Sequence, residues 1–145
     1  NPTNNIEWWK EAAEAARAFI TRNNQQTKPY KLYRTSDNDP TRHGEINAIK
    51  NTCKNMSTFD LSGCELYTSA YPCPMCLGAI MWANIKTVYY GATAQDTGNI
   101  GFRDDFMYEW LNNKNEDSLR LIEMDRKECV EVQKMWLDKD DKIEY

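Results

Sequence analysis

The sequence predicts an α/β fold in which a mixed or parallel sheet lies between helices. Stretches with apolar residues at helical spacing alternate with short runs that favour strands. A strand, a short helix and a second strand follow one another over residues 65–91, and such a βαβ unit makes its two strands parallel with a right-handed crossover. Because the 145 residues show no internal repeat and no boundary, we expect a single domain over residues 1–145.

The first half of the chain is predicted to hold two helices and a short strand. Apolar residues recur at helical spacing from Ile6 to Ile20 and indicate a first helix, and residues 31–35 favour a strand. Asp39-Pro40 indicates the start of a second helix, because Asp can cap a helix and Pro is tolerated in its first turn. The apolar face of this helix is expected to carry Ile46, Ile49, Cys53 and Met56.

The second half continues the alternation of strands and helices. Residues 65–69 and 86–91 favour strands, and a helix between them begins near Pro74, with Leu77, Ile80 and Met81 directed inward. The later segments are predicted as a loop over 98–105, a short helix over 106–111, a polar linker over 112–117, a strand over 119–124 and an amphipathic helix with Cys129, Val132 and Met135 or Trp136 on its apolar side.

Composition and charge restrict the partners that can be expected. The net charge is −4, with no overall excess of Lys and Arg. Proteins that hold nucleic acid by its phosphates normally present a basic face, so we do not expect nucleic acid as a partner, and a small nucleobase or nucleoside fits the charge better. No stretch approaches the ~20 consecutive apolar residues that span a bilayer, so no membrane partner is expected either.

The five cysteines are an odd number, and Cys73 and Cys76 stand in a C-x-x-C pattern. Reduced thiols fit this usage better than a disulfide framework, which predicts a cytoplasmic protein. For Cys53, Cys64 and Cys129 we expect small, buried, hydrophobic side chains. The chain opens without Met and with neither a basic nor an apolar leader, so we expect the natural chain to begin earlier.

The single histidine and the paired cysteines predict a zinc site with one ion per chain. His43 lies thirty residues before Cys73 in the segment Pro72-Cys73-Pro74-Met75-Cys76. One imidazole and two thiolates suit zinc better than magnesium or calcium, which prefer oxygen ligands. Three protein ligands leave the fourth tetrahedral position for water, and that open position distinguishes a catalytic zinc site from a structural one. Both ligand segments are expected at helix N-termini, whose partial positive charge favours thiolates.

Other interpretations of these residues stay open. A C-x-x-C pair inside a βαβ unit is also typical of a redox dithiol. A structural zinc site would need a fourth protein ligand, which Cys53 or Cys64 could supply.

Glu45, two residues after the histidine, is the candidate for proton transfer. Hydrolytic removal of an exocyclic amine needs hydroxide at neutral pH, and bound zinc lowers the pKa of water to about 7. One carboxylate can take a proton from this water and pass protons to the ring nitrogen and to the leaving amine. H-x-E together with P-C-x-x-C is the pattern of zinc deaminases that act on bases.

With these motifs the chain resembles the cytidine and deoxycytidylate deaminase superfamily, and more closely its guanine deaminase branch. The resemblance implies a three-layer α-β-α sandwich of the cytidine deaminase type, with a mixed sheet and helices on both faces. It also implies that His43, Cys73 and Cys76 bind zinc and that Glu45 moves protons. The matching segments lie within residues 37–145 and include 39–49, 66–69, 72–80, 101–106 and 141–145.

The resemblance further implies substrate contacts and a dimer. Asp104 would read the purine and Tyr145 would close over the base, and Ala70 and Trp82 are further candidates for substrate binding. The branch exchanges its C-terminal segment between two subunits, which implies a homodimer with shared sites. The alternatives are that Asp104 or Asp105 caps the helix that follows, that Tyr145 belongs to a frayed end, and that Trp82 packs in the core.

Residues 21–42 depart from the family pattern. The family has a β-hairpin between its first helix and the H-x-E helix, with a base-binding Asn before the zinc histidine. This segment is too short for such a hairpin, and Leu32 and Tyr33 stand where the Asn is expected.

The function that fits these features best is zinc-dependent hydrolysis of free guanine, with water, to xanthine and ammonia. Deamination of guanosine, cytosine or another small base would use the same metal chemistry. A tRNA adenosine deaminase ranks below these because the acidic balance lacks a surplus of phosphate-binding residues. A protein of another class, whose zinc only stabilises a binding surface without catalysis, stays open because of the short segment at 21–42.

Overall fold

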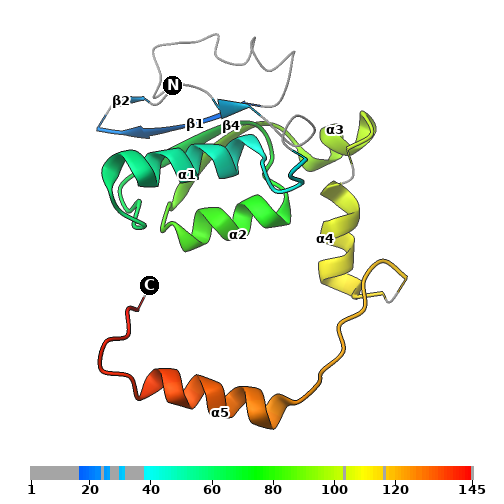
Figure 1. Cartoon of the computed structure of the whole chain (residues 1–145). Coiled ribbons are helices and arrows are strands. Elements are labelled where there is room, and N and C mark those ends of the chain that lie inside the picture. Colours follow the sequence, from blue (N-terminus) through cyan, green and yellow to red (C-terminus); the bar gives the residue numbers. More distant parts are fainter. Residues whose placement is uncertain are drawn as a thin grey trace. The chain divides into compact units, whose positions relative to one another are not determined.

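The structure is a computed structural model that describes residues 17–23, 25–26, 30–31, 38–102, 104–115 and 117–144 (Figure 1). Its contacts divide the chain into two compact units, Asn1–Tyr108 and Glu109–Tyr145. The expectation of a single domain stays a prediction, and we describe each unit by itself. None of the described helices has the length and apolar composition that crossing a bilayer requires.

The helices and strands follow the alternation that the sequence indicates. In chain order they are β1 (Arg17–Arg22), β2 (Gln25–Gln26), β3 (Tyr30–Lys31), α1 (Gly44–Met56), β4 (Glu65–Ala70), α2 (Pro74–Trp82), β5 (Thr87–Ala92), α3 (Ala94–Asn99), α4 (Asp104–Asn113) and α5 (Arg126–Leu137). Only α5 and the last turns of α4 fall in the second unit.

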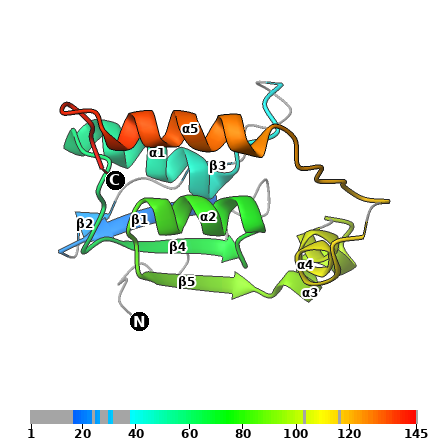
Figure 2. The ribbon, with the colours of Figure 1, turned by 90° about the horizontal axis from the view of Figure 1, so that it is seen from below.

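The sheet is mixed, as predicted. Its strands follow the order β2-β1-β4-β5, and β3 also pairs with β1. β1 is antiparallel to β2, β3 and β4, whereas β4 and β5 are parallel, with Leu66 opposite Val88. The parallel pair joined by α2 is the predicted βαβ unit. Both α1 and α2 lie over the same face of the sheet (Figures 1 and 2).

The core lies between this face and the two helices. Alternate residues of β1 and β4 turn toward α1 and α2. With residues of the helices and of the loops beside them they form a cluster of Ala18, Ile20, Ala48, Leu61, Cys64, Leu66, Ile80, Ala83 and Ile85. The intervening residues stack on the opposite face: the rings of Phe19 and Tyr67 are 4.7 Å apart, and those of Tyr67 and Tyr89 are also 4.7 Å apart. The alternation gives β4 one face for the core and one for an aromatic stack.

The predicted first helix is wrong at its C-terminal end. Residues 17–22 form strand β1, although Ile20 shares helical spacing with Ile6. The segment forms a strand because it pairs with β4 and buries Ala18 and Ile20. These contacts outweigh the helical spacing of its apolar residues, since strand preference depends on cross-strand packing. The earlier part of that helix, most of the strand at 31–35, and Leu32 and Tyr33 lie outside the described residues.

The segment predicted to be too short for a hairpin does hold a small one. β1 turns into β2 with Arg22 opposite Gln25. The pairing fits into a short segment because β1 already begins at Arg17, within the predicted helix, and because β2 has only two residues.

Two helix boundaries also differ from the prediction. α1 begins at Gly44 with His43 as its N-cap, because Asp39 caps a turn instead: its carboxylate accepts hydrogen bonds from the backbone N–H and hydroxyl of Thr41 at 2.9 and 2.6 Å. The predicted loop at 98–105 begins inside α3, which starts with a capping box between Thr93 and Asp96. That T-x-x-D pattern is visible in the sequence and was missed.

Several apolar side chains predicted to be buried are exposed. Met81 in α2 is 69% exposed, and Cys129 in α5 is also exposed. The predicted strand at 119–124 is absent from the described second unit, because no described strand there offers a pairing partner for its backbone. The exposed apolar residues of this unit include Leu121, Ile122, Met124, Val132, Met135 and Leu137.

Gly91 in β5 offers a test of the parallel pair. An added Cβ would lie 2.8 Å from the carbonyl oxygen of Ser69 in β4, so Gly91→Ala is expected to lower the free energy of unfolding by about 1–3 kcal/mol. Gly78→Ala in α2 is the control, because an added Cβ there meets nothing within 4 Å and Ala favours a helix by up to about 1 kcal/mol. Urea unfolding measures both variants, and equal stability would contradict the β4–β5 packing.

Candidate metal centre

Three side chains from the N-terminal ends of α1 and α2 meet at one point. Nδ1 of His43 lies 3.6 Å from Sγ of Cys73 and 3.6 Å from Sγ of Cys76. Both cysteines are buried and His43 is half-buried. The structure thus brings together the three ligands that the sequence predicts, which come from segments thirty residues apart.

The spacing of the three atoms fits a tetrahedral zinc ion. With Zn–S near 2.3 Å and Zn–N near 2.0–2.1 Å, a tetrahedral angle places a nitrogen ligand about 3.6 Å from a sulfur ligand, which is the separation observed. Among the described residues, no fourth Cys, His, Asp or Glu belongs to the group. Cys53 and Cys64 therefore do not complete a structural site, and the fourth position is left for a small molecule such as water.

The local sequence places these ligands at helix ends. His43 is the N-cap of α1 and Cys73 the N-cap of α2, and Pro74 supplies the first residue of α2. Neither side chain makes a capping hydrogen bond to its helix. The partial positive charge of the helix N-terminus favours a thiolate, as expected from the sequence.

Asn47 holds the segment that carries His43. Its side chain is fully buried, and its Oδ1 accepts a hydrogen bond from Nε of Arg42 at 3.1 Å. Its Nδ2 donates to the carbonyl of Arg42 at 3.4 Å, and its backbone N–H donates to the carbonyl of His43 at 3.0 Å. These bonds tie the residues before α1 to its first turn and fix the position of the histidine.

Asn47→Ala is expected to lower the free energy of unfolding by about 1–3 kcal/mol, because it removes two part-buried hydrogen bonds that tie Arg42 to the first turn of α1. It should also weaken zinc binding about tenfold, since partners that orient a ligand contribute to metal affinity. Asn51→Ala is the control, because the side chain of Asn51 donates to the carbonyl of Asn47 within the helix. Competition with a chromogenic zinc chelator measures both, and equal zinc affinity in the two variants would contradict this role.

The hydrogen bond between Cys73 and Cys76 moves the pKa values of the two thiols in opposite directions. A hydrogen bond from the Cys76 thiol, together with the hydrogen bond and charge of His43, lowers the pKa of Cys73 to about 4 against the opposing effect of burial. The same hydrogen bond and burial raise the pKa of Cys76. The hydrogen bond to Cys73 raises the pKa of His43. A divalent ion replaces these protons, because zinc takes thiolates and a neutral imidazole.

Glu45 is buried beside the sulfurs in the first turn of α1, with only 6% of its surface exposed. Burial raises the pKa of its carboxyl, and a hydrogen bond with Cys76 and the charge of His43 offset this in part. A carboxyl group with a raised pKa can accept and return protons near neutral pH.

Thr68 in β4 supports Glu45 and was not singled out from the sequence. Its hydroxyl lies 3.2 Å from Oε1 of Glu45 and 3.0 Å from the carbonyl oxygen of Ala70. Because the hydroxyl has one proton and can also accept, it can bond to Glu45 in either protonation state. The sequence does carry one sign of this role, because Thr68 is a polar residue on the core-facing side of a strand that is otherwise buried.

Asp104, the first residue of α4, lies within electrostatic range of the metal ligands. Burial raises the pKa of its carboxyl most, the Cys73 thiolate raises it further, and His43 lowers it. Asp105, the other predicted capping candidate, is exposed, and its Oδ1 accepts from the N–H of Phe106 at 2.9 Å.

Helix α4 also contacts the segment that leads into the cysteines. The Tyr108 hydroxyl donates a hydrogen bond to the carbonyl of Pro72, and burial raises the pKa of this phenol. The ring of Tyr71 packs edge-on against Tyr90 and Tyr108, with centroids 4.9 and 6.0 Å away. This contact could not be predicted from the sequence, because a tyrosine in an amphipathic helix has no fixed partner.

The remaining predicted substrate residues are placed differently. Ala70 ends β4, three residues before Cys73. Trp82 is 68% exposed at the C-terminal end of α2, so the alternative that it packs in the core is wrong. It follows Cys76 by six residues, or about 9 Å along the helix. Tyr145 lies outside the described residues.

This arrangement is that of a zinc-binding domain: His43, Cys73 and Cys76 would hold the ion, and the buried carboxyl group of Glu45, which is not among these ligands, lies beside them. Residues 10–92 match the family described as the cytidine and deoxycytidylate deaminase zinc-binding region. The chain belongs to this family. Its α/β fold, its mixed sheet and its zinc cofactor are those expected from the sequence.

Within the family the chain is similar to guanine deaminase. It is 47% identical over 83 residues to the guanine deaminase of Bacillus subtilis, an alignment that covers 57% of this chain and 53% of that protein. The X-ray structure of guanine deaminase from Bacillus subtilis superposes with a TM-score of 0.83 and 34% identity, and it covers 94% of this chain and 89% of that one.

A second relative acts on RNA according to its name. The tRNA-specific adenosine deaminase of Haemophilus influenzae is 41% identical over 75 residues, which cover 52% of this chain and 43% of that protein. In sequence, the chain thus spans about half the length of the curated relatives it matches.

Proposed function

We propose that the protein hydrolyses a purine base, guanine, to xanthine and ammonia. The observation that carries this proposal is Glu45, a buried carboxyl group that is not part of the metal-ligand group yet lies beside it. Similarity to a guanine deaminase over nearly the whole chain supports the choice of base. A protein that uses zinc only for stability has no need of a buried carboxyl group next to the open position.

The chemistry divides between the metal and the protein. When bound, zinc lowers the pKa of a coordinated water and so makes hydroxide accessible at neutral pH. Glu45 would accept one proton of the water and donate it to the ring nitrogen as the C–O bond forms. It would then carry the second proton, from the hydroxyl group now on the ring carbon, to the amine, which leaves as ammonia when the C–N bond breaks. Thr68 holds the carboxyl group of Glu45 in position while its protonation state changes.

Asp104 is proposed to recognise the purine. Its position within electrostatic range of Cys73 and His43 supports this, because a carboxylate there can accept hydrogen bonds from ring and amino N–H groups. Ala70 and Tyr145 are proposed as further contacts, on the basis of the family resemblance. We do not include Trp82, since it lies at the end of α2 opposite the cysteines.

We further propose a cytoplasmic homodimer that exchanges its C-terminal segment. In the second unit, Val132, Met135 and Leu137 of α5 are between 60% and 69% exposed. Such an uncovered apolar face is typical of a surface that binds another chain. Sedimentation of the purified protein tests the dimer, and a monomer at all concentrations would contradict it.

An ammonia-release screen tests the proposed substrate. We expect release from guanine above release from guanosine, cytosine, cytidine and adenine by at least about 100-fold in kcat/KM, since a site built to bond one base edge leaves polar groups unpaired with another. Highest turnover of adenosine in a tRNA hairpin would instead favour the RNA-acting relatives. No release from any base by zinc-loaded protein would favour a zinc-stabilised binding protein.

Asp104→Ala is expected to lower kcat/KM for guanine roughly 10- to 100-fold, because a hydrogen bond to a charged group is lost. Zinc content should stay unchanged, since Asp104 is not among the grouped ligands. Asp105→Ala is the matched control, because it removes the carboxylate next to Asp104 in the sequence, which is exposed. Equal kinetics of the two variants on guanine would reject Asp104 as the purine contact.

A further inference from the structure

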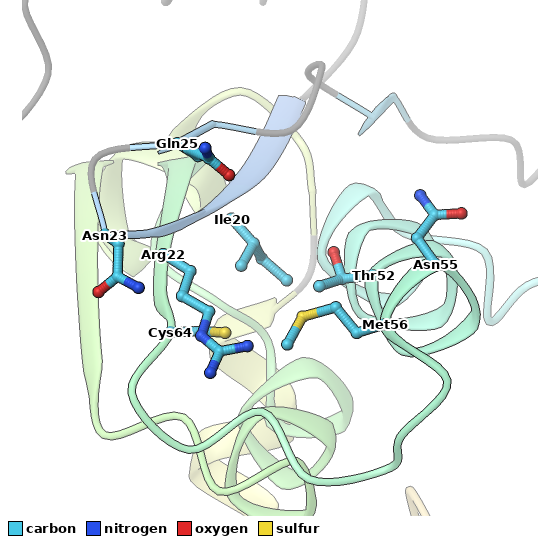
Figure 3. Close-up of a pocket in the computed structure, with 8 residues that line it drawn as sticks. All are labelled: Ile20, Arg22, Asn23, Gln25, Thr52, Asn55, Met56 and Cys64. Atoms are coloured by element: carbon cyan, nitrogen blue, oxygen red, sulfur yellow. The ribbon is translucent and has the colours of Figure 1, made fainter.

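Figure 3 shows a hollow between β1 and the last turns of α1, and none of its lining residues belongs to the metal centre or to α4. The contact that bears on the proposed reaction lies near the other end of α1. There residues 104–108 of α4, which belong to the first unit, lie within electrostatic range of the metal ligands. They include Asp104, the proposed purine contact, and Tyr108.

Asp104 and Tyr108 lie on the same face of α4. They are four residues apart, and side chains at this spacing are neighbours on the surface of a helix. Burial raises the pKa of both groups most, and the charge of Cys73 raises both further. This face of α4 is therefore the one turned toward the metal centre.

Tyr108 bonds to a point that the rest of the fold already fixes. Its hydroxyl donates to the carbonyl of Pro72, which is fully buried and directly precedes the predicted ligand Cys73. The backbone on both sides of Pro72 is held as well: the N–H of Tyr71 donates to the carbonyl of Ala92 in β5 at 2.8 Å, and Cys73 is the N-cap of α2. Pro72 is therefore the fixed end of the bond, and α4 is the end that it holds.

Helix α4 has no buried side chain to keep its first turns in place. None of its residues 104–113 is buried, whereas α2 buries Cys76 and Ile80. A segment with few buried contacts can open or shift at a low cost in free energy. The position of Asp104 therefore depends strongly on individual contacts of α4, such as the hydrogen bond of Tyr108.

We propose that Tyr108 is a positioning residue for purine recognition, because its bond to the Pro72 carbonyl holds Asp104 in place at the metal centre. This inference rests on the proposed function of Asp104. A misplacement of about 1 Å caused by a change away from the reacting atoms can cost an enzyme as much as 10²-fold in rate. Tyr108 thus affects guanine turnover without contacting the base.

Tyr108→Phe tests this role, because it removes the hydroxyl and keeps the ring that packs against Tyr71. In zinc-loaded protein it is expected to raise KM for guanine about 3- to 10-fold, the effect of one lost hydrogen bond, with kcat nearly unchanged. In the Asp104→Ala background the same change should have no further effect, because Tyr108 acts through Asp104. Tyr89→Phe is the matched control: its ring lies in the aromatic stack on the other face of the sheet, so KM should stay that of the unmodified protein.

A second measurement does not depend on turnover. Cobalt binds the same kinds of nitrogen and sulfur sites as zinc, and its unpaired electrons shift the NMR signals of amides according to their position relative to the ion. In the cobalt-loaded full chain, Tyr108→Phe is expected to change these shifts for residues 104–108 and to leave those of α1 as they are. Tyr89→Phe should change neither.

Unchanged cobalt-induced shifts over residues 104–108, or an equal effect of Tyr89→Phe, would overturn the positioning role. So would an unchanged KM in a protein that turns over guanine, or an additive loss when Tyr108→Phe is combined with Asp104→Ala. A loss of zinc affinity in Tyr108→Phe would overturn it too, because the hydroxyl would then act on Cys73. Changed shifts in a protein that does not turn over guanine would support the positioning of Asp104 and reject the proposed function instead.

Discussion

Glu45→Gln is expected to lower kcat for ammonia release from guanine by about 10²- to 10⁴-fold, the range that a general acid–base catalyst contributes. The amide keeps the size of the side chain and can still bond to Thr68, but it cannot accept and return a proton at neutral pH. Stopped assays of released ammonia measure the loss. Because Glu45 is not part of the metal-ligand group, the zinc content should stay at one per chain.

Glu109→Gln provides the control for this variant. It makes the same chemical change on an exposed position of α4 and should retain full turnover. Turnover by Glu45→Gln close to that of the control would reject the proton-transfer role. Loss of zinc together with turnover would mean that Glu45 acts through the metal site and not on the substrate.

Cys73→Ser is expected to reduce bound zinc from one per chain to about a tenth of that or less, because a hydroxyl is a far weaker ligand than a thiolate and three ligands cannot spare one. Turnover should fall with the metal. The melting temperature should fall as well, since an ion that binds only the folded state stabilises it. Elemental analysis after gel filtration measures the zinc.

Cys129→Ser is the control for this loss. Cys129 is an exposed cysteine outside the metal-ligand group, so its replacement should keep one zinc per chain. Equal zinc in the two variants would contradict the proposed ligand set. Retention of zinc by Cys73→Ser with loss in Cys64→Ser would restore the alternative of a structural site.

The convergence of the two cysteines could be predicted from the sequence because their spacing has a local cause. A cysteine at a helix N-cap and another in its first turn point to the same side, so Cys73 and Cys76 converge whatever the rest of the chain does. The strand–helix–strand order around them could also be predicted, since a parallel pair needs a crossover.

The parts that failed depend on distant partners. Residues 17–22 become a strand because β4 is available beside them, and this is not encoded in the apolar spacing of the segment. Tyr108 was missed for the same reason, because it is defined by its bond to Pro72 in a distant part of the chain. Asn47 was missed although its partner Arg42 is close in sequence, because the path of the loop before α1 does not follow from helical spacing. The exposed Met81 shows the same limit: helical spacing indicates an apolar residue but not what covers it.

X-ray absorption at the zinc edge of the purified protein tests the central claim most directly. The proposed centre predicts two sulfur ligands at about 2.3 Å and two lighter ligands at about 2.0–2.1 Å, one of which exchanges with solvent or an added base. Three or four sulfur ligands, or a fourth ligand from the protein that no added base displaces, would contradict a catalytic zinc site.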